Sequence, residues 1–242
     1  MNNIDHIFVI NLEKRKDRLQ YFMDQCQKYG IKDQVEVYEA VDGTKLLPTK
    51  EIKDLFRNNK FRFKAGICGC AMSHYNLWKK IVTFPPKSRT IVFEDDATFC
   101  DDFLTKWNKV SSAIPDDCYF LYLNINNGSK NIKFVTKQNE HFSNHFSGGH
   151  GTFGYMITPE IAGELIHYCN KDGMTDAIDW MIMNMFKGTK TVNEKEYKIN
   201  GYYGYRLIDP LITHSATVGK DSNVRGRGAN KSILENTIST IS

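Results

Sequence analysis

Three adjacent carboxylates, Glu94, Asp95 and Asp96, follow directly after the apolar run TIVF at residues 90–93. An uninterrupted apolar run of this length is typical of a strand in a parallel sheet that is covered on both faces. Because side chains alternate along an extended chain, we predict that Glu94 and Asp96 point to one side and Asp95 to the other. Their oxygens suit Mg²⁺ or Mn²⁺, ions that also bind diphosphate. A solvated acidic turn or helix cap is the alternative.

The elements that must position these carboxylates alternate between strand and helix. Apolar runs predict strands at residues 7–12, 34–41, 90–93, 119–123, 155–158 and 205–213. Helical spacing of apolar residues predicts helices at 13–29, 66–82, 159–169 and 176–186. This alternation indicates an α/β fold with a mostly parallel central sheet flanked by helices. Ligands of such sheets bind beyond the carboxyl ends of the strands, where the acidic triplet stands.

Length and composition are those of a soluble globular protein, with 242 residues of which 41% are hydrophobic and 25% charged. A net charge of +4 is too balanced for a protein that coats nucleic acid. We expect one domain at residues 1–219 and a flexible tail at 220–242, which is rich in Ser, Asn, Gly and charge.

Targeting signals are not evident in the sequence. The first apolar run is shorter than a signal-peptide core, and no stretch approaches the roughly 20 apolar residues of a membrane span. We therefore expect a cytoplasmic location. The six cysteines are expected to be reduced, mostly buried thiols, as is usual in that compartment.

Seven short motifs occur in one order along the chain, and the set resembles glycosyltransferase family 25, which includes lipooligosaccharide biosynthesis transferases and collagen hydroxylysine galactosyltransferases. The motifs are INLEKRKDR (10–18), AVDG (40–43), GICGCAMSH (66–74), IVFEDD (91–96), GTFGYMIT (151–158), AIDWMI (177–182) and DPLITHSATVGKDSNV (209–224). The resemblance implies a Rossmann-like GT-A type fold and an inverting transfer from a UDP-sugar. It also implies a divalent metal, Mn²⁺ or Mg²⁺, held by the acidic motif, with Asp95 among the donor-binding residues.

The resemblance places the nucleotide just beyond the first strand. There Asn11, Leu12, Arg15 and Arg18 could reach base, ribose or phosphate, and the two arginines share nearby faces at i, i+3 spacing. The alternative is an amphipathic helix start with solvated charges. Asp42, after the second predicted strand, is a further candidate for ribose or base contact. A plain Asp–Gly turn explains it equally well.

The helix beside the donor site would carry Ser73 and His74. This segment is no phosphate-binding P-loop, because no Gly-Lys-Ser/Thr follows, and neighbours on a helix cannot form a hydrolase triad. A hydrogen-bonded core histidine remains the other interpretation of His74. Gly151, in the glycine-rich stretch 147–152, is expected to let the backbone approach the sugar, or else to form only a sharp loop.

Two residues of the C-terminal half complete the predicted site. His214 follows an apolar run and could complete the metal shell with Glu94 and Asp96, with the basic tail folding over the diphosphate; a strand-end histidine is the alternative. Asp179, at the start of a predicted helix, is the candidate general base. Asp176 is its rival, although Asp176 also suits a helix N-cap, and Asp179 could merely favour the helix N-terminus.

These residues together predict a metal-dependent inverting glycosyltransferase. It would move a hexose, galactose or glucose, from a UDP-sugar to a hydroxyl of a glycan or protein acceptor, with peripheral contact to a membrane-linked acceptor left open. The alternative is a non-catalytic domain that binds nucleotide sugars or glycans. A metal-dependent phosphohydrolase would also use clustered carboxylates, but nothing else in the sequence supports it.

Overall fold

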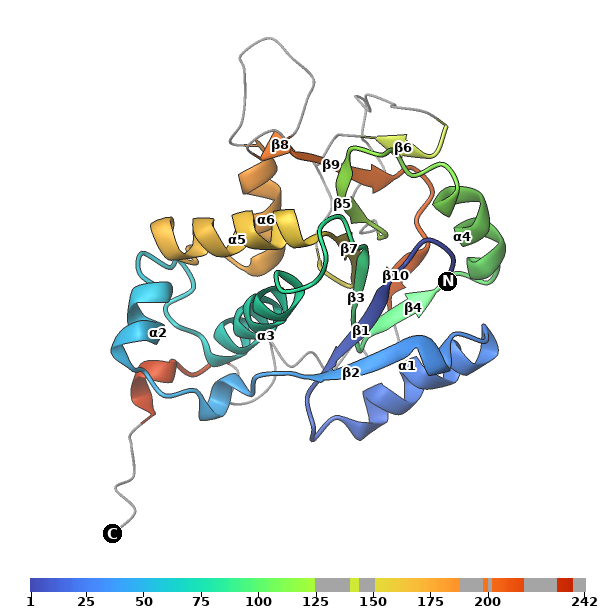
Figure 1. Ribbon diagram of the computed structural model, residues 1–242. Coiled ribbons are helices and arrows are strands. Elements are labelled where there is room, and N and C mark those ends of the chain that lie inside the picture. Colours follow the sequence, from blue (N-terminus) through green and yellow to red (C-terminus); the bar gives the residue numbers. More distant parts are fainter. Residues whose placement is uncertain (125–139, 144–150, 188–197, 200–201, 216–229, 237–242) are drawn as a thin grey trace.

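The computed structural model describes residues 1–124, 140–143, 151–187, 198–199, 202–215 and 230–236. An eight-stranded sheet has the order β2-β1-β3-β7-β5-β9-β6, with β8 beside β9 (Figure 1). Its strands are β1 (His6–Asn11), β2 (Val35–Glu39), β3 (Thr90–Glu94), β5 (Cys118–Tyr122), β6 (Phe142–Ser143), β7 (Gly154–Ile157), β8 (Lys198–Ile199) and β9 (Tyr202–Leu207). Strands β1, β2, β3, β5 and β9 run in one direction, whereas β6, β7 and β8 oppose them. The predicted α/β class with a mostly parallel sheet is confirmed.

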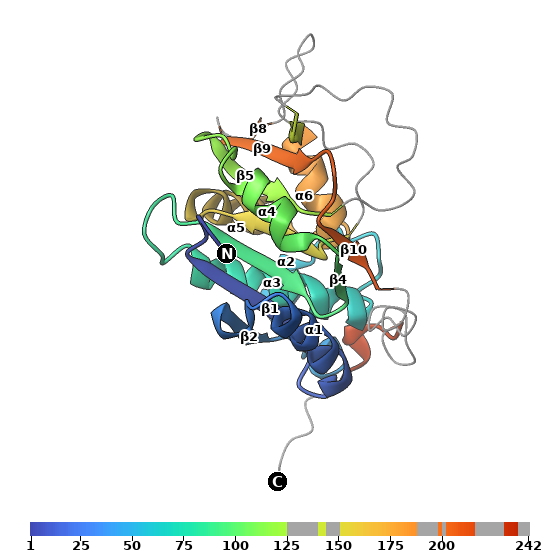
Figure 2. The same ribbon diagram turned by 90° about the vertical axis from the view of Figure 1, so that its right-hand side faces the viewer.

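Helices cover both faces of this sheet, as Figures 1 and 2 show. One layer holds α2 (Lys50–Leu55), α3 (Ala65–Ile81), α5 (Pro159–Asp172) and α6 (Ile178–Lys187), and the other holds α1 (Lys16–Lys28) and α4 (Phe103–Ser111). Strand β3 shows how the sequence serves both layers. Val92 packs with the α3 side, while Ile91 and Phe93 pack with the α1 side, and all three are fully buried. The uninterrupted apolar run is therefore explained by two covered faces.

A second, two-stranded sheet stands beside the carboxyl end of β3. The chain turns at Asp95 and Asp96 into β4 (Ala97–Phe99), which pairs antiparallel with β10 (Ile212–His214). The single strand predicted at residues 205–213 is therefore wrong, because Pro210 lies between β9 and β10 and cannot continue a ladder. The break places His214 opposite Ala97, next to the acidic triplet.

The last described segment, residues 230–236, folds back onto the N-terminal half; we call it the C-terminal clasp. Its Ile233 is fully buried in the core on the α3 side, and the backbone of Ala65 bonds to Lys231 at 2.8 Å. Asn236 Nδ2 donates to the carbonyls of Thr44 at 3.1 Å and Leu46 at 2.8 Å, at the 3-10 turn η2 (Gly43–Lys45). The predicted flexibility of 220–242 thus fails for the clasp, because Ile233 finds an apolar niche there; the rest of that range lies outside the described residues.

Other features agree with expectation or add to it. All six cysteines are free thiols, as predicted. Helices α2 and α4 and strand β4 were not predicted. Within the described part of the chain, no helix combines the length and the apolar character needed to cross a bilayer.

Candidate functional site at the carboxyl end of β3

Glu94 is the last residue of β3, and its carboxylate turns toward α3. Its Oε1 accepts hydrogen bonds from Thr152 Oγ1 and from His74 Nε2, the latter at 3.2 Å. His74 Nδ1 lies 2.9 Å from the Tyr155 hydroxyl, which also accepts a bond from Trp78 Nε1 at 3.0 Å. Since indole only donates, the Tyr155 proton is left for His74 Nδ1, and the histidine proton then sits on Nε2 and points at Glu94. His74 is thus a hydrogen-bonded core residue that also orients Glu94.

Asp95 and Asp96 are both bound by one buried arginine. Arg18 Nη1 lies 3.0 Å from Asp95 Oδ1 and 3.1 Å from Asp96 Oδ2, and Asn11 Nδ2 donates to Asp95 Oδ2 at 2.7 Å. The predicted alternation through residues 94–96 is wrong, because β3 ends at Glu94 and the next two residues form a turn. Asn11 and Arg18 therefore hold the acidic turn against the end of β1.

The carboxylates of Asp95 and Asp96 lie close together and are almost completely shielded from water. Burial raises the pKa of Asp95 to about 6, although Arg18 favours its charged form. The buried Oδ1 of Asp96 has no hydrogen-bond partner among the described residues. A buried acceptor of this kind is costly unless something donates to it or coordinates it. Asp96 Oδ1 is therefore an acceptor that could coordinate a cation.

His214 stands across from this turn at the end of β10. Its Nε2 lies 3.6 Å from Asp96 Oδ2, and its ring lies 4.8 Å from the Phe153 ring. The nearby Asp96 carboxylate is the main cause that raises the pKa of His214. Asp96 and His214 are thus brought together as expected of two metal ligands, but Glu94 has no direct contact with either among the described interactions.

A different trio is gathered more tightly in the described part of the chain. The ligand atoms of Cys70, His74 and Glu94 lie within 4.8 Å of one another. Burial raises the pKa of the Cys70 thiol well above its usual range, and Glu94 adds to this effect. A protonated thiol is a poor partner for hard ions such as Mg²⁺ or Mn²⁺. We therefore interpret Cys70 as a residue that lines the site and does not bind such an ion.

The segment Gly151, Thr152 and Phe153 joins the two halves of the site. Gly151 N donates to Asp179 Oδ2 at 2.9 Å, and the next residue, Thr152, donates to Glu94. Asn124 fixes the segment, because its Nδ2 donates to the Gly151 carbonyl at 3.2 Å. Consecutive residues thus hold two carboxylates that are distant in sequence. Gly151 has φ 96°, a conformation that favours glycine.

Asp179 lies in the first turn of α6, as predicted. Its Oδ1 accepts from Trp180 N at 2.9 Å, so the carboxylate receives one backbone donor on each oxygen. The rival Asp176 forms an ion pair with Lys60 at 2.8 Å. Of the two acids, Asp179 is the one bonded to the segment that carries Thr152.

A pocket of about 440 Å³ opens beside the carboxyl ends of β1 and β2. It is lined by Leu12, Glu13, Lys14, Glu39, Ala40, Val41, Asp42, Lys45 and Leu46. Lys14 Nζ pairs with Asp42 Oδ2 at 2.6 Å on its wall. Burial alone would raise the pKa of Asp42, but the bonds from Lys14 and Thr44 outweigh it and lower that pKa. Asp42 also caps η2, so its predicted turn role is real and coexists with its place in the pocket.

Two further predicted residues lie beside this pocket without lining it. Ser73 Oγ accepts from Val41 N at 2.8 Å and donates to the Gly69 carbonyl at 2.7 Å, so it fixes the pocket floor to α3. Arg15 pairs with Asp17 at 2.7 Å. The structure thus brings Leu12 and Asp42 to the pocket, and gives Ser73 a supporting position.

Sequence reasoning missed Thr152, Asn124, Tyr155 and Cys70 as parts of the site. Thr152 and Tyr155 belong to a motif that had been singled out only for Gly151. Cys70 stands four residues before His74, a spacing that places both on one helix face. Asn124 directly follows a predicted strand, so its position at the sheet edge was the available signal.

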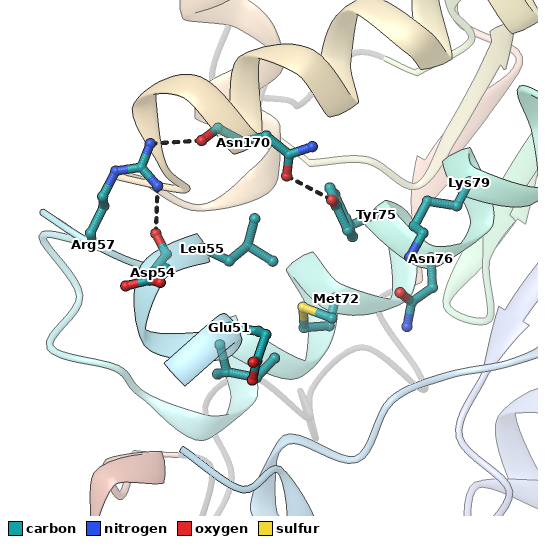
Figure 3. A pocket seen from close by; sticks show the side chains of 10 residues that line it. Glu51, Asp54, Leu55, Arg57, Met72, Tyr75, Asn76, Lys79 and Asn170 are labelled. Atoms are coloured by element: carbon teal, nitrogen blue, oxygen red, sulfur yellow. Dashed lines mark hydrogen bonds between the residues drawn. The ribbon is translucent and has the colours of Figure 1, made fainter. Parts of the chain in front are cut away.

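A second hollow, of about 310 Å³, lies elsewhere, among α2, α3 and α5 (Figure 3). Here the polar groups bind one another: Arg57 Nη2 donates to the Asn170 carbonyl at 2.8 Å, and the Tyr75 hydroxyl donates to Asn170 Oδ1 at 2.8 Å. Arg57 Nη1 also donates to the Asp54 carbonyl at 2.6 Å. No residue predicted for the site lines this hollow.

The sequence is similar to known proteins over most of its length. Human procollagen galactosyltransferase 2 is 30% identical over 207 residues, which cover 80% of this chain and 32% of that protein. The mouse protein named inactive glycosyltransferase 25 family member 3 is 32% identical over 119 residues, covering 46% of this chain and 19% of the relative. The chain thus spans a third or less of the length of these relatives.

Among solved structures, a Drosophila β1,4-galactosyltransferase 7 mutant in complex with manganese, UDP-Gal and xylobiose aligns over 90% of this chain and 97% of its own. The TM-score is 0.32 at 11% identity. Residues 4–182 match the model of "Glycosyltransferase family 25 (LPS biosynthesis protein)". The sheet described above has the mostly parallel α/β arrangement that was expected, and the chain belongs to glycosyltransferase family 25.

Proposed function

We propose that this chain transfers a hexose from a UDP-sugar to a hydroxyl group of a glycan or protein acceptor, with inversion at the anomeric carbon. One observation carries the proposal: consecutive residues, Gly151 and Thr152, hold Asp179 and Glu94 at the carboxyl edge of the sheet. This edge is where ligands of α/β sheets bind. Family membership supports the reaction class.

The donor would lie along this edge from the pocket to the acidic turn. The pocket between β1 and β2 would take the uridine, with Leu12 against the base and Asp42 near the ribose. Asn11 and Arg18 fix Asp95 and Asp96, so that the acidic turn does not collapse when the diphosphate arrives. This arrangement would leave the sugar facing Gly151 and Asp179.

The residues at the turn fit a divalent cation, Mn²⁺ or Mg²⁺. Among the described residues Asp96 Oδ1 has no partner, and this oxygen is a hard acceptor; His214 Nε2 already faces the same carboxylate. The two bonds that described residues make to Glu94 both go to Oε1, so Oε2 would serve the ion. We therefore assign Glu94, Asp96 and His214 as the holding residues. When bound, the cation would neutralise charge on the leaving diphosphate.

Asp179 would act as the general base. It would take the proton of the acceptor hydroxyl while the oxygen forms a bond to the anomeric carbon and the bond from that carbon to UDP breaks. Its two backbone donors, Gly151 N and Trp180 N, keep the carboxylate fixed. The ring of Trp180 is 44% exposed beside it and would contact the acceptor sugar.

The test is release of UDP from a panel of UDP-sugars by the purified chain with Mn²⁺, without acceptor and then with simple glycosides. Release should require the metal and be lost in Glu94→Gln and Asp96→Asn, while Asp33→Asn, an exposed acid on another turn, should behave as wild type. Metal-dependent UDP binding without release from any donor would instead favour a non-catalytic binding domain, in line with a relative named inactive.

A further inference from the structure

A row of polar side chains crosses the sheet beneath α3 and α6. Strand register places Tyr155 of β7 opposite Tyr122 of β5, and Tyr122 opposite Arg206 of β9. Residues directly opposite in a sheet point to the same face. Tyr155 and Tyr122 both pack on the α3 side, and the neighbours of Arg206, Tyr205 and Leu207, pack on the other. The row therefore begins at Tyr155, the partner of His74, and reaches Arg206, which lies opposite Ser143 of β6 at the sheet edge.

Arg206 is a buried cation without a counterion in the described part of the chain. The residue is 5% exposed, and neither Nε nor Nη1 has a hydrogen-bond partner there. Burial lowers the pKa of its guanidinium, and no anion among the described residues offsets the loss of water. Arg18, which is equally buried, contacts two carboxylates. A buried charge without a partner is costly to the fold, and none of the described residues supplies that partner to Arg206, so the position is suited to binding an anion.

The place of Arg206 shows which partner this would be. Strand β9 runs in the same direction as β3 and β5, so Arg206, one residue from its end, stands toward the edge that carries the acidic turn. Two strand spacings, about 10 Å, separate it from Tyr155. The donor pocket lies at the opposite end of the sheet, beside β2. Arg206 therefore stands on the side of the sheet that the donor pocket leaves for the acceptor.

We propose that Arg206 binds an anionic group of the acceptor, a carboxylate or a phosphate, and so selects acidic acceptors over neutral ones. The inference rests on the proposed function in naming the acceptor, but the anion site itself does not require transfer to occur. Guanidinium groups pair well with both kinds of oxyanion.

A first measurement asks whether Arg206 serves the fold or a ligand. In chloride buffer, Arg206→Met should raise the Tm of the free protein by about 2–4 °C, because it removes an unpaired buried charge. Lys109→Met, which removes one positive charge from the exposed face of α4, should leave the Tm unchanged. A lower Tm for Arg206→Met, or its failure to fold, would mean that the arginine is structural and would overturn the proposal.

A second measurement asks for the anion. Inorganic phosphate and acetate, each replacing chloride at constant ionic strength, are titrated while the Tm is followed. Wild type and Lys109→Met should be stabilised by about 2–4 °C near saturation, Arg206→Lys should keep part of this response, and Arg206→Met should lose it. A response to phosphate alone indicates a phosphorylated acceptor, and one to acetate alone a carboxylate. No response in wild type, or an equal response in Arg206→Met, would overturn the proposal.

UDP release from UDP-sugars without acceptor separates this inference from the proposed function. It should be the same in Arg206→Met as in wild type, because the donor lies at the other end of the sheet. If wild type releases no UDP, the proposed transfer is refuted, while the anion titration still decides whether Arg206 binds an anion. Loss of release in Arg206→Met alone would place Arg206 at the donor and contradict the assignment to the acceptor.

Discussion

Two regions of this molecule differ in whether their buried polar groups have hydrogen-bond partners. In the hollow among α2, α3 and α5, Arg57 and Tyr75 have their bonds within the protein (Figure 3). At the carboxyl edge of the sheet, Asp96 Oδ1 and two nitrogens of Arg206 are buried without partners in the described structure. Size does not separate the two regions, since the hollow measures about 310 Å³ and the pocket beside β1 and β2, whose Lys14 and Asp42 are paired, about 440 Å³. Unmet bonding capacity does, and it marks the edge as the place for ligands.

The strongest way to break this contrast is Asp179→Asn. Loss of the base should lower transfer by at least about 10²-fold with little change in donor affinity, because Asp179 is assigned to the acceptor proton. Steady-state kinetics with the preferred UDP-sugar measure both quantities. The control is Asp176→Asn, which removes the ion pair with Lys60 and alters a 3.3 Å bond from Thr175, away from the assigned base. Transfer by Asp179→Asn at close to the wild-type rate would show that the base is another group.

Gly151→Ala tests whether the edge depends on the shape of its backbone. An added Cβ would meet the Phe153 ring at 2.4 Å, and the residue has φ 96°. We expect a loss of roughly 1–3 kcal/mol in the free energy of unfolding and a fall in kcat, since Thr152 and Phe153 move together. Gly163→Ala on α5 is the matched control, because its Cβ would meet Val82 at 3.6 Å, an ordinary contact. Equal stability of the two variants would contradict a constrained segment.

Arg57→Met examines the satisfied region and mirrors the variant at Arg206. Removing bonds to the carbonyls of Asp54 and Asn170 should lower the free energy of unfolding by about 1 kcal/mol. Donor hydrolysis should not change. Urea unfolding of both Met variants gives the comparison: opposite signs are expected, and the same sign in both would remove the distinction between the regions.

A further prediction is a pH dependence at Asp95. Its pKa is raised to about 6 in the folded chain, so the folded state holds the proton more tightly than the unfolded one. The stabilising contribution of protonated Asp95 is therefore full below its unfolded pKa near 4 and is lost as pH rises through about 6. The Tm of wild type minus that of Asp95→Asn, measured with EDTA, should fall between pH 4 and 6. A flat difference would mean that Arg18 compensates fully.

Local patterns were enough to predict the framework of the site. The apolar run of β3 and the acids that follow it predicted the position of Glu94. The helix that bears Ser73 and His74 was predicted from the helical spacing of its apolar residues. These features depend on neighbours in sequence, which is why one chain suffices to find them.

Contacts between distant segments could not be predicted in the same way. Asp95 and Asp96 turn toward Arg18 because β4 must reverse to meet β10, a pairing between residues more than a hundred positions apart. The bond from Thr152 to Glu94 likewise depends on β7 entering the sheet antiparallel to β3. That two nitrogens of Arg206 have no hydrogen-bond partner among the described residues can be seen only in the folded structure, since the sequence shows an ordinary strand arginine.

The clasp sets an order of assembly for the molecule. Leu46 lines the pocket between β1 and β2, yet its carbonyl is tied to Asn236, 190 residues later. On the ribosome, the sheet edge that forms this pocket therefore emerges about 190 residues before the residue that fastens it. We therefore expect the pocket wall to stay loosely held in the nascent chain and to become fixed only after residue 236 has left the exit tunnel.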